Sequence, residues 1–357
     1  MKIFDPTTVG RVPLANRVVM APLTRLRAGQ AAVPGDLLVE HYRQRAGMGL
    51  ILTEGTYPVV EGRTWTGQPG IETAEQAAGW ARVADGVHAA GGRIAMQIMH
   101  GGRIAHPDVT GAARVVSASA VAAPGEIRTP AGKAAHPVPH ALDADEIAEV
   151  VRGFVAGARR AVDAGLDAVE VHGANGYLIH QFLSPASNLR TDGYGGTAEG
   201  RARLAVEVVT AVAAEVGADR TGIRLSPEHD IQGAVETDPE VTAATYAALA
   251  DGLAPLGLAF VDVLHRDLRG DLVQGIRRRA GAPLIGNSGF AMNTTRDEAV
   301  GLVEEGVVDL AAVGRAALAN PDLVARWARD LGENAPDPAT FYAAGAEGYT
   351  DYPTAAA

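Results

Sequence analysis

Eight short runs of mainly aliphatic residues recur along the chain, and longer stretches with helical periodicity separate them. The runs cover residues 18–20, 50–53, 94–98, 168–171, 222–225, 260–264, 283–286 and 310–313. Most runs are nearly continuous apolar sequences, which is typical of parallel strands that are buried on both faces of a sheet. The alternation of such strands with helices predicts an α/β protein.

Five of the intervening stretches have the apolar spacing of amphipathic helices. They cover residues 73–90, 143–164, 199–216, 239–256 and 294–305. The second of them has the clearest start, because Asp143, Asp145 and Glu146 place negative charges at its first turn. Four stretches are followed by a glycine that suits a left-handed helix cap, namely Gly91, Gly165, Gly217 and Gly306.

Eight such strands can form either an open, doubly wound sheet or a closed barrel. An open nucleotide-binding sheet would carry a Gly-x-Gly-x-x-Gly loop after its first strand. The first run here leads instead into the sequence APLTR at residues 21–25. The count of eight favours a closed (β/α)8 barrel, and 357 residues are within the range of one barrel with insertions. Because no linker or repeat divides the sequence, we expect a single TIM-barrel domain over residues 1–357.

Residues 111–140 form the one long segment without clear periodicity, and they are rich in Ala, Pro, Gly and Ser. At about 30 residues, the segment is longer than ordinary connections in compact domains. It follows the third strand, so we expect a capping excursion over one mouth of the barrel. Its histidines, His136 and His140, are expected to be exposed to solvent.

Composition and charge narrow the possible partners. The chain has 31 basic and 42 acidic residues and a net charge of −11, which argues against nucleic acid or an anionic membrane as a partner. It has no cysteine, which excludes disulfides, thiolate nucleophiles, Cys-ligated zinc and Cys-bound iron–sulfur clusters. The first residues lack the apolar run of a signal peptide, and no apolar stretch reaches the roughly 18 residues of a membrane span. We therefore expect a soluble, cytoplasmic protein.

The carboxyl ends of the strands matter most for function, because (β/α)8 enzymes build their active sites there. Small or polar residues at these ends are Thr24, Glu54, Gly55, Gln97, His172, Asn175, Tyr177, Arg224, Asn287, Ser288, Gly289, Gly314 and Arg315. The last three follow strands seven and eight, where this fold commonly binds phosphate. Glycine lets backbone amides approach phosphate oxygens and arginine pairs with them, so a ligand that carries phosphate is indicated. The alternative is that the two glycines only permit tight turns.

Gln97 and Arg224 lie within strands and are expected to point into the barrel. A buried charge needs a partner. A bound cofactor with acceptor atoms would supply a partner for Arg224, and an internal ion pair with Asp or Glu is the alternative.

His172, Asn175 and Tyr177 follow the fourth strand within six residues. The first two are close enough in sequence to converge on one carbonyl oxygen, where two neutral donors would stabilise the charge of an enolate-like transition state. The phenol of Tyr177 could deliver a proton to a neighbouring carbon. Each residue alone could equally be a satisfied polar group in a loop, but three together at a strand end favour a functional site.

A metal-dependent hydrolase or lyase of the same fold is an alternative function. His100 follows the third strand and His265 the sixth, so a metal site completed by a carboxylate is conceivable. Against it, no His-x-His follows the first strand and no His-Glu-x-x-His occurs in the chain. A Schiff-base enzyme would need a lysine at a strand end, whereas Lys2 and Lys133 are the only lysines.

Several stretches, in consistent order from Phe4 to Pro353, strongly resemble the old yellow enzyme family of flavoproteins. The longest is HGANGYLIHQFLSPASNLRTDGYGG at residues 172–196. The others are MAPLTR at 20–25, GIRLSP at 222–227, VGR at 313–315, NPDL at 320–323, and the tail from FY at 341–342 to YTDYP at 349–353. The resemblance covers nearly the whole chain, and its longest motif is highly specific.

The resemblance implies a (β/α)8 barrel that binds FMN non-covalently and is reduced by NADPH or NADH. It further implies hydride transfer to the β carbon of small alkenes activated by a carbonyl or nitro group. By position, His172 and Asn175 match the pair that holds the substrate carbonyl, and Tyr177 matches the proton donor. Residues that match FMN contacts are Pro22, Leu23, Thr24, Gly55, Gln97, Arg224, Gly289, Gly314 and Arg315. A non-catalytic flavin-binding protein remains an alternative, and the chain could be a monomer or a dimer.

Thr24 makes the chain similar to the branch of pentaerythritol tetranitrate and N-ethylmaleimide reductases, since another branch carries Cys at this position. Three further residues match walls of the substrate pocket: Trp65, Met99 and Tyr342. Two of them depart from the family pattern, because Met99 stands where many relatives have Trp and Trp65 stands where many have Tyr.

Overall fold

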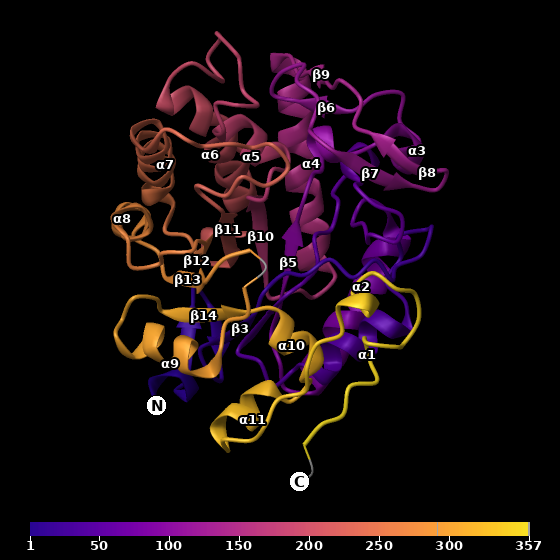
Figure 1. Cartoon of the computed structure of the whole chain (residues 1–357), viewed down its shortest axis with the longest axis vertical. Helices are drawn as coiled ribbons and strands as arrows, with labels where there is room; N and C mark the ends of the chain where they lie inside the picture. The colour runs from indigo at the N-terminus through magenta and orange to yellow at the C-terminus, as the bar shows by residue number, and fades with distance from the viewer. Residues whose placement is uncertain (291, 356–357) are drawn as a thin grey trace.

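Eight parallel strands close into a barrel at the centre of the molecule (Figure 1). The computed structural model describes residues 1–290 and 292–355. The barrel strands are β3 (Val18–Met20), β4 (Leu50–Leu52), β5 (Ile94–Ile98), β10 (Ala168–Gly173), β11 (Thr221–Leu225), β12 (Phe260–Leu264), β13 (Leu284–Asn287) and β14 (Leu310–Val313). They pair in chain order, and β14 pairs with β3 to close the barrel. Each predicted run overlaps one of these strands, so the predicted (β/α)8 fold is confirmed.

Side chains alternate between the inside and the outside of the barrel along each strand. On β3, Val19 belongs to the interior cluster, whereas Val18 and Met20 pack against the surrounding helices. Apolar residues fill the amino-terminal half of the interior, among them Leu50, Leu52, Ala95, Ala168, Phe260, Ile285 and Leu310. The polar residues of the strands are therefore concentrated in the carboxyl half of the barrel.

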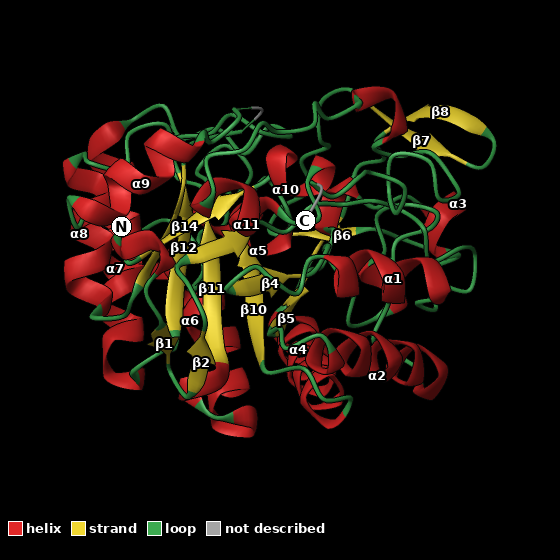
Figure 2. Ribbon diagram, turned by 90° about the horizontal axis from the view of Figure 1, so that it is seen from below, coloured by secondary structure: helices red, strands yellow, loops and turns green. Residues whose placement is uncertain are grey.

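A hairpin of β1 (Thr7–Val9) and β2 (Val12–Leu14) closes the amino-terminal end of the barrel (Figure 2). Val9, Val12 and Leu14 join the interior cluster. The sequence did not predict this hairpin, because its strands have only three residues each.

Helices surround the barrel, and two of the longest begin at capping boxes. The helices are α1 (Asp36–Gln44), α2 (Ala74–Ala89), α3 (Pro107–Thr110), α4 (Ala144–Asp163), α5 (Leu178–Leu183), α6 (Ala198–Val216), α7 (Pro239–Leu253), α8 (Asp271–Ala280), α9 (Arg296–Glu304), α10 (Arg315–Ala319) and α11 (Leu323–Ala328). Thr73 caps α2 reciprocally with Gln76, and Asp143 caps α4 with Glu146. All five predicted helices are present to within three residues at each end.

Glycine and proline determine how several of these helices end. The four predicted cap glycines all have positive φ angles, between +71° at Gly306 and +100° at Gly217. The prediction of a helix over residues 239–256 was too long, because α7 ends at Leu253 and continues as a 3-10 turn at Ala254–Leu256. Pro255 has no amide hydrogen and cannot continue the α-helical pattern.

The segment at residues 111–140 is more regular than predicted. It holds β6 (Val116–Ser117), which pairs with β9 (His140–Ala141), and a hairpin of β7 (Glu126–Thr129) and β8 (Gly132–Ala135). Figure 2 shows this hairpin at the end of the barrel opposite β1 and β2. The expectation that His136 is exposed was wrong, since its Nδ1 is buried and burial lowers the pKa of its ring. His140 is exposed, with its Nε2 2.7 Å from Glu146 Oε2.

After α11 the chain returns across the barrel as a tail that two buried arginines hold. Arg25 Nη2 donates to the carbonyl oxygen of Gly348 at 2.7 Å, and Arg27 Nη2 donates to that of Thr340 at 3.0 Å. Because both arginines follow β3, the tail lies against the loop between β3 and α1. None of the helices within the described residues combines the length and the apolar character needed to cross a membrane.

Candidate active site

Four buried polar side chains from neighbouring strands form what we call the polar floor of the site: Gln97 on β5, Glu170 on β10, Arg224 on β11 and Asp262 on β12. Gln97 Nε2 donates to Glu170 Oε1 at 2.8 Å. Arg224 Nη1 forms an ion pair with Asp262 Oδ2. The internal ion pair that the sequence left open for Arg224 is therefore present, and Gln97 also has an acidic partner.

The two carboxyl groups of the polar floor both have a pKa above their usual range. Burial raises the pKa of Glu170 well above its usual range, and the negative charge of Asp262 raises it further. Burial also raises the pKa of Asp262, whereas the charge of Arg224 opposes this shift. Glu170 Oε2 and Asp262 Oδ1 have no hydrogen-bond partner among the described residues, and a proton on Glu170 would provide a donor at this place. With Glu170 protonated and Asp262 ionised, the floor would carry one negative charge beside the positive charge of Arg224.

Buried polar atoms without a hydrogen-bond partner among the described residues also include Arg224 Nε, His172 Nδ1 and Asn175 Oδ1. A buried donor or acceptor that is left unpaired costs about 1–3 kcal/mol. A polar ligand bound at the carboxyl end of the barrel would relieve this cost. A flavin fits this requirement, because its ring carries both acceptors and donors.

His172 lies one residue before the end of β10 and is paired in the sheet register with Arg224. Burial lowers the pKa of His172 well below its usual range, and the positive charge of Arg224 lowers it further. Its imidazole is therefore neutral at physiological pH, as the sequence-based interpretation of a neutral donor requires.

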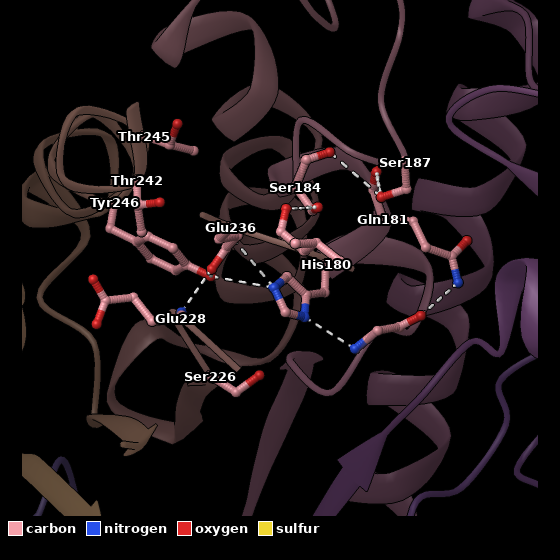
Figure 3. A network of polar contacts seen from close by, with 12 residues as sticks. His180, Gln181, Ser184, Ser187, Ser226, Glu228, Glu236, Thr242, Thr245 and Tyr246 are labelled. Carbon is pink, nitrogen blue, oxygen red and sulfur yellow. Dashed lines mark hydrogen bonds and ion pairs between the residues drawn. The ribbon is translucent and has the colours of Figure 1, made fainter. Parts of the chain in front are cut away.

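Asn175 and Gly176 turn the chain out of β10 with left-handed φ angles of +57° and +77°. The Asn175 amide donates to Ser226 Oγ at 2.7 Å, and the Asn175 carbonyl oxygen accepts from Gln232 Nε2 at 2.7 Å. The Gly176 amide donates to His180 Nδ1 at 2.9 Å (Figure 3). Side chains from the loop after β11 and from α5 thus fix the backbone of this turn.

Tyr177 precedes α5 and packs in an apolar cluster with Met99, Ile104 and Ala123, against which Trp65 also packs. Its ring centroid lies 5.2 Å from that of His172 and 5.9 Å from that of Trp65. Burial raises the pKa of the Tyr177 phenol above its usual range, so its hydroxyl is protonated at neutral pH. The fold thus brings Tyr177 and His172 together with two of the predicted pocket residues.

Met99 and Tyr342 occupy different parts of this region. Met99 is buried, and a Cβ added to Gly55 would lie 2.7 Å from the Met99 sulfur. Tyr342 lies on the carboxyl-terminal tail and is 66% exposed. It still contributes to the raised pKa of Tyr177, which places the two phenols near each other. Tyr342 therefore lies at the edge of the cluster rather than within it.

The predicted phosphate residues follow β13 and β14, which are neighbours in the barrel. Gly289 has a φ of +132°, a conformation that favours glycine and also fits the alternative of a tight turn. A Cβ added to Gly314 would touch the Leu23 side chain at 3.7 Å. The Arg315 guanidinium carbon lies 6.0 Å from the Phe341 ring centroid. Gly314 thus lies beside the loop after β3, where the other expected cofactor contacts are.

The loop after β3 carries three expected cofactor contacts at residues 22–24, all half-buried. Glu54 Oε2 accepts the backbone amides of Arg25 and Leu26 at 3.0 and 3.1 Å. Glu54, at the carboxyl end of β4 directly before Gly55, therefore holds this loop in place.

His100 and His265, which the sequence offered as metal ligands, make separate contacts. His100 Nδ1 accepts the Gly102 amide at 3.1 Å, and burial lowers the pKa of His100 to about 4. His265 Nε2 lies 3.2 Å from Glu228 Oε2. Among residues 1–290 and 292–355, no three His, Asp or Glu side chains are placed to hold a metal ion.

Several residues of the site were not predicted from the sequence, and only some of them have a recognisable pattern there. Glu170 lies two residues before His172, and Asp262 interrupts the apolar run of β12, so alternation along the strands could have assigned both to the interior. Gln232 and Glu236 lie in a loop without periodicity, and their contacts depend on the folded chain.

Known proteins resemble this chain in sequence and in fold. Residues 2–334 match the profile of the NADH:flavin oxidoreductase / NADH oxidase family. A probable flavin mononucleotide-dependent alkene reductase of Leishmania infantum is 44% identical over 359 residues, which cover 98% of this chain and 97% of the relative. The solved old yellow enzyme homologue of Zymomonas mobilis superposes with a TM-score of 0.92 at 37% identity, covering 99% of each chain. Morphinone reductase in complex with tetrahydroNAD superposes with a TM-score of 0.90 at 41% identity, covering 100% of this chain and 98% of the other.

Proposed function

The chain belongs to the NADH:flavin oxidoreductase / NADH oxidase family, in its old yellow enzyme group, and we propose that it reduces alkenes activated by a carbonyl or nitro group. It is an FMN-dependent ene-reductase that takes its reducing equivalents from a nicotinamide cofactor. The observation that carries the proposal is the closeness of a neutral His172 to a protonated Tyr177, whose ring centroids lie 5.2 Å apart beside the turn that carries Asn175.

Residues of the polar floor and of the loops after β3, β4, β13 and β14 would hold FMN. Gln97 and Arg224 would contact the flavin ring, and the unpaired Arg224 Nε supports this role. Around the ring we place Pro22, Leu23, Thr24 and Gly55, and at the phosphate Gly289, Gly314 and Arg315. When bound and reduced by NADPH or NADH, FMN supplies the hydride that adds to the β carbon of the alkene.

His172 and Asn175 would bind the oxygen of the activating group. Because the pKa of His172 lies well below its usual range, its imidazole binds as a neutral donor and brings no charge that would have to be desolvated. Donors that are already oriented stabilise the negative charge that develops on this oxygen as the double bond is reduced.

Tyr177 would deliver the proton that completes the reduction. Its raised pKa keeps the proton on the phenolic oxygen until the neighbouring carbon becomes basic. The surrounding apolar cluster of Met99, Ile104 and Ala123 limits access of water to this oxygen. Trp65, Met99 and Tyr342 would form walls of the substrate pocket.

We place the whole activity in one FMN-binding domain over residues 1–357. The pairing of β14 with β3 and the return of the tail to Arg25 and Arg27 support this assignment, since both ends of the chain contact the same part of the barrel. The partners would be the nicotinamide cofactor and small activated alkenes.

The test compares the two half-reactions of wild type and Tyr177→Phe by anaerobic stopped-flow absorbance. NADPH should bleach the flavin of both proteins at similar rates. 2-Cyclohexenone should restore the colour of wild type rapidly and that of the variant about 10²–10⁴-fold more slowly, the usual contribution of a general acid. Cyclohexanone, which lacks the double bond, is the control and should restore neither. If 2-cyclohexenone did not reoxidise wild type, the proposed function would be wrong.

A further inference from the structure

A buried polar network, shown in Figure 3, contacts through His180 the turn that carries Asn175 and Tyr177. Its members are His180 on α5, Tyr246 on α7, and Glu228 and Glu236 in the loop between β11 and α7. The His180 and Glu236 side chains are 0% and 1% exposed. None of these residues has a role in the proposed reaction.

His180 links the network to the turn through one ring nitrogen. Because Nδ1 accepts the Gly176 amide hydrogen at 2.9 Å, this nitrogen carries no proton, and a neutral ring must carry its proton on Nε2. Nε2 lies 3.3 Å from Glu236 Oε1. The assignment of donors is therefore fixed by the contacts: Gly176 donates to His180, and His180 donates to Glu236.

Glu236 is the acceptor on which the other groups converge. Its Oε1 accepts the Tyr246 hydroxyl at 3.1 Å in addition to His180, and its Oε2 accepts the Glu228 amide at 2.8 Å. Burial and the charge of Glu236 raise the pKa of Tyr246 well above its usual range, so this hydroxyl stays protonated and donates. An ionised carboxylate can only accept hydrogen bonds, and it therefore selects the His180 tautomer whose proton is on Nε2.

The turn requires such support because its backbone is unusual. Six non-glycine residues have positive φ within the described residues, and three of them meet here: Asn175, Glu228 and Gln232. Such conformations are unfavourable for residues with a side chain and persist where the surroundings fix them. The turn is also tightly packed, since a Cβ added to Gly176 would lie 2.5 Å from the Ile231 carbonyl oxygen.

We propose that Glu236 is a positioning residue for the carbonyl site: through His180 it holds the Gly176 amide, and thereby the left-handed Asn175 and the adjacent Tyr177, in the orientation that binds substrate. This inference rests on the proposed roles of Asn175 and Tyr177. The observation that carries it is the unbroken series of hydrogen bonds from Glu236 through His180 to the backbone of the turn.

The first arm of the test determines the His180 tautomer in FMN-loaded wild type and needs neither a substrate nor a folded Glu236 variant. In protein labelled with 15N-histidine, the ring nitrogen shifts of His180 are assigned by the loss of its signals in His180→Asn. We expect a proton on Nε2 and none on Nδ1 at pH 7. A proton on Nδ1 would overturn the proposal.

The second arm measures the binding of cyclohexanone, an unreactive ketone, by its perturbation of the flavin absorbance. The amide of Glu236→Gln has a single acceptor oxygen, which can serve either His180 and Tyr246 or the Glu228 amide, but not both. We expect about tenfold weaker binding, or ~1.4 kcal/mol, with FMN retention and the rate of flavin reduction by NADPH unchanged. Tyr246→Phe is the matched control: it removes one donor but leaves the acceptor for His180, so it should bind within about twofold of wild type, well below one hydrogen bond's typical contribution.

A double-substitution cycle separates this role from general support of the fold. His180→Asn offers Gly176 an acceptor oxygen that does not depend on Glu236. In that background Glu236→Gln should therefore have no further effect on cyclohexanone binding. Unchanged binding in the single Glu236→Gln variant, or an equal loss in both backgrounds, would refute the role of Glu236. A wild type that binds no cyclohexanone would instead refute the carbonyl site itself.

Discussion

Arg224 on β11 and Asp262 on β12 form an ion pair inside the barrel, at positions that are directly paired in the sheet register. Arg224 is 4% exposed and Asp262 is fully buried. Asp262 therefore offsets much of the positive charge that Arg224 could present to a bound flavin. The effective charge of the polar floor depends on this pair and on Glu170, whose pKa burial raises well above its usual range.

The first prediction concerns the reduction potential of bound FMN. Asp262→Asn removes the negative charge and should raise the midpoint potential by on the order of 30 mV, or ~1.4 kcal/mol for a two-electron couple. Glu170→Gln is the matched control, since it replaces a protonated carboxyl with an amide of similar shape and leaves the charge unchanged. Anaerobic reductive titration against a reference dye measures both potentials. Equal shifts in the two variants would contradict the assignment of the charge to Asp262.

A second prediction tests the phosphate site. Arg315→Ala should weaken FMN retention by roughly 1.5–3 kcal/mol, because it removes a hydrogen bond to a charged group. The measurement is FMN binding to apoprotein by fluorescence quenching. Arg329→Ala, which removes the same charge at an exposed position, is the control and should bind as wild type does. Wild-type affinity in Arg315→Ala would show that the phosphate lies elsewhere.

A third prediction separates the roles of His172 and Asn175 from support of the flavin. His172→Ala and Asn175→Ala should each slow reoxidation by an enone by up to about 10²–10³-fold, the cost of losing one oriented donor. Flavin reduction by nicotinamide should change much less. Single-turnover kinetics of the two half-reactions give both rates. An equal loss in both would indicate damage to the fold or the flavin site rather than to a carbonyl site.

Met99 provides the fourth prediction, since it packs with Tyr177 where many relatives have Trp. Met99→Trp should narrow the pocket and disfavour 3-substituted cyclohexenones relative to 2-cyclohexenone. Shape differences of this size change discrimination by about 1–3 kcal/mol, or 10–200-fold in the ratio of kcat/KM values. Met99→Leu, which nearly conserves volume, should leave the ratio within about twofold. A ratio that Met99→Trp leaves unchanged, in protein that retains FMN, would place Met99 outside the pocket.

The barrel could be predicted because each of its strands and helices has a recognisable pattern within a short stretch of sequence. Strands buried on both faces, such as Phe260–Leu264, read as apolar runs, and the Asp143 cap appears as an acidic first turn. The β7–β8 hairpin escaped prediction because only Ile127 and Thr129 of β7 are buried, and two alternations are too few to distinguish a strand from a loop.

The residues of the site also fall into two groups, those that a local sequence pattern identifies and those that only the fold brings together. His172, Asn175 and Tyr177 could be found from the sequence because they follow a strand directly. The contact of His180 with Glu236 spans 56 residues, and no local pattern joins them. The sequence left open a ligand or an acid as the partner of Arg224, and the structure shows an acid. Only the register of β11 and β12 identifies this acid as Asp262.

The most direct test of the central claim follows the hydride. Wild-type protein is supplied with NADPH that carries deuterium at the transferable C4 position, together with 2-cyclohexenone in ordinary water. The product cyclohexanone is then analysed by 2H NMR. We predict one deuterium at the β carbon and hydrogen from the solvent-exchangeable Tyr177 hydroxyl at the α carbon. A product without deuterium at the β carbon, or recovery of unreacted enone while NADPH is consumed, would contradict the assignment of this chain as an ene-reductase.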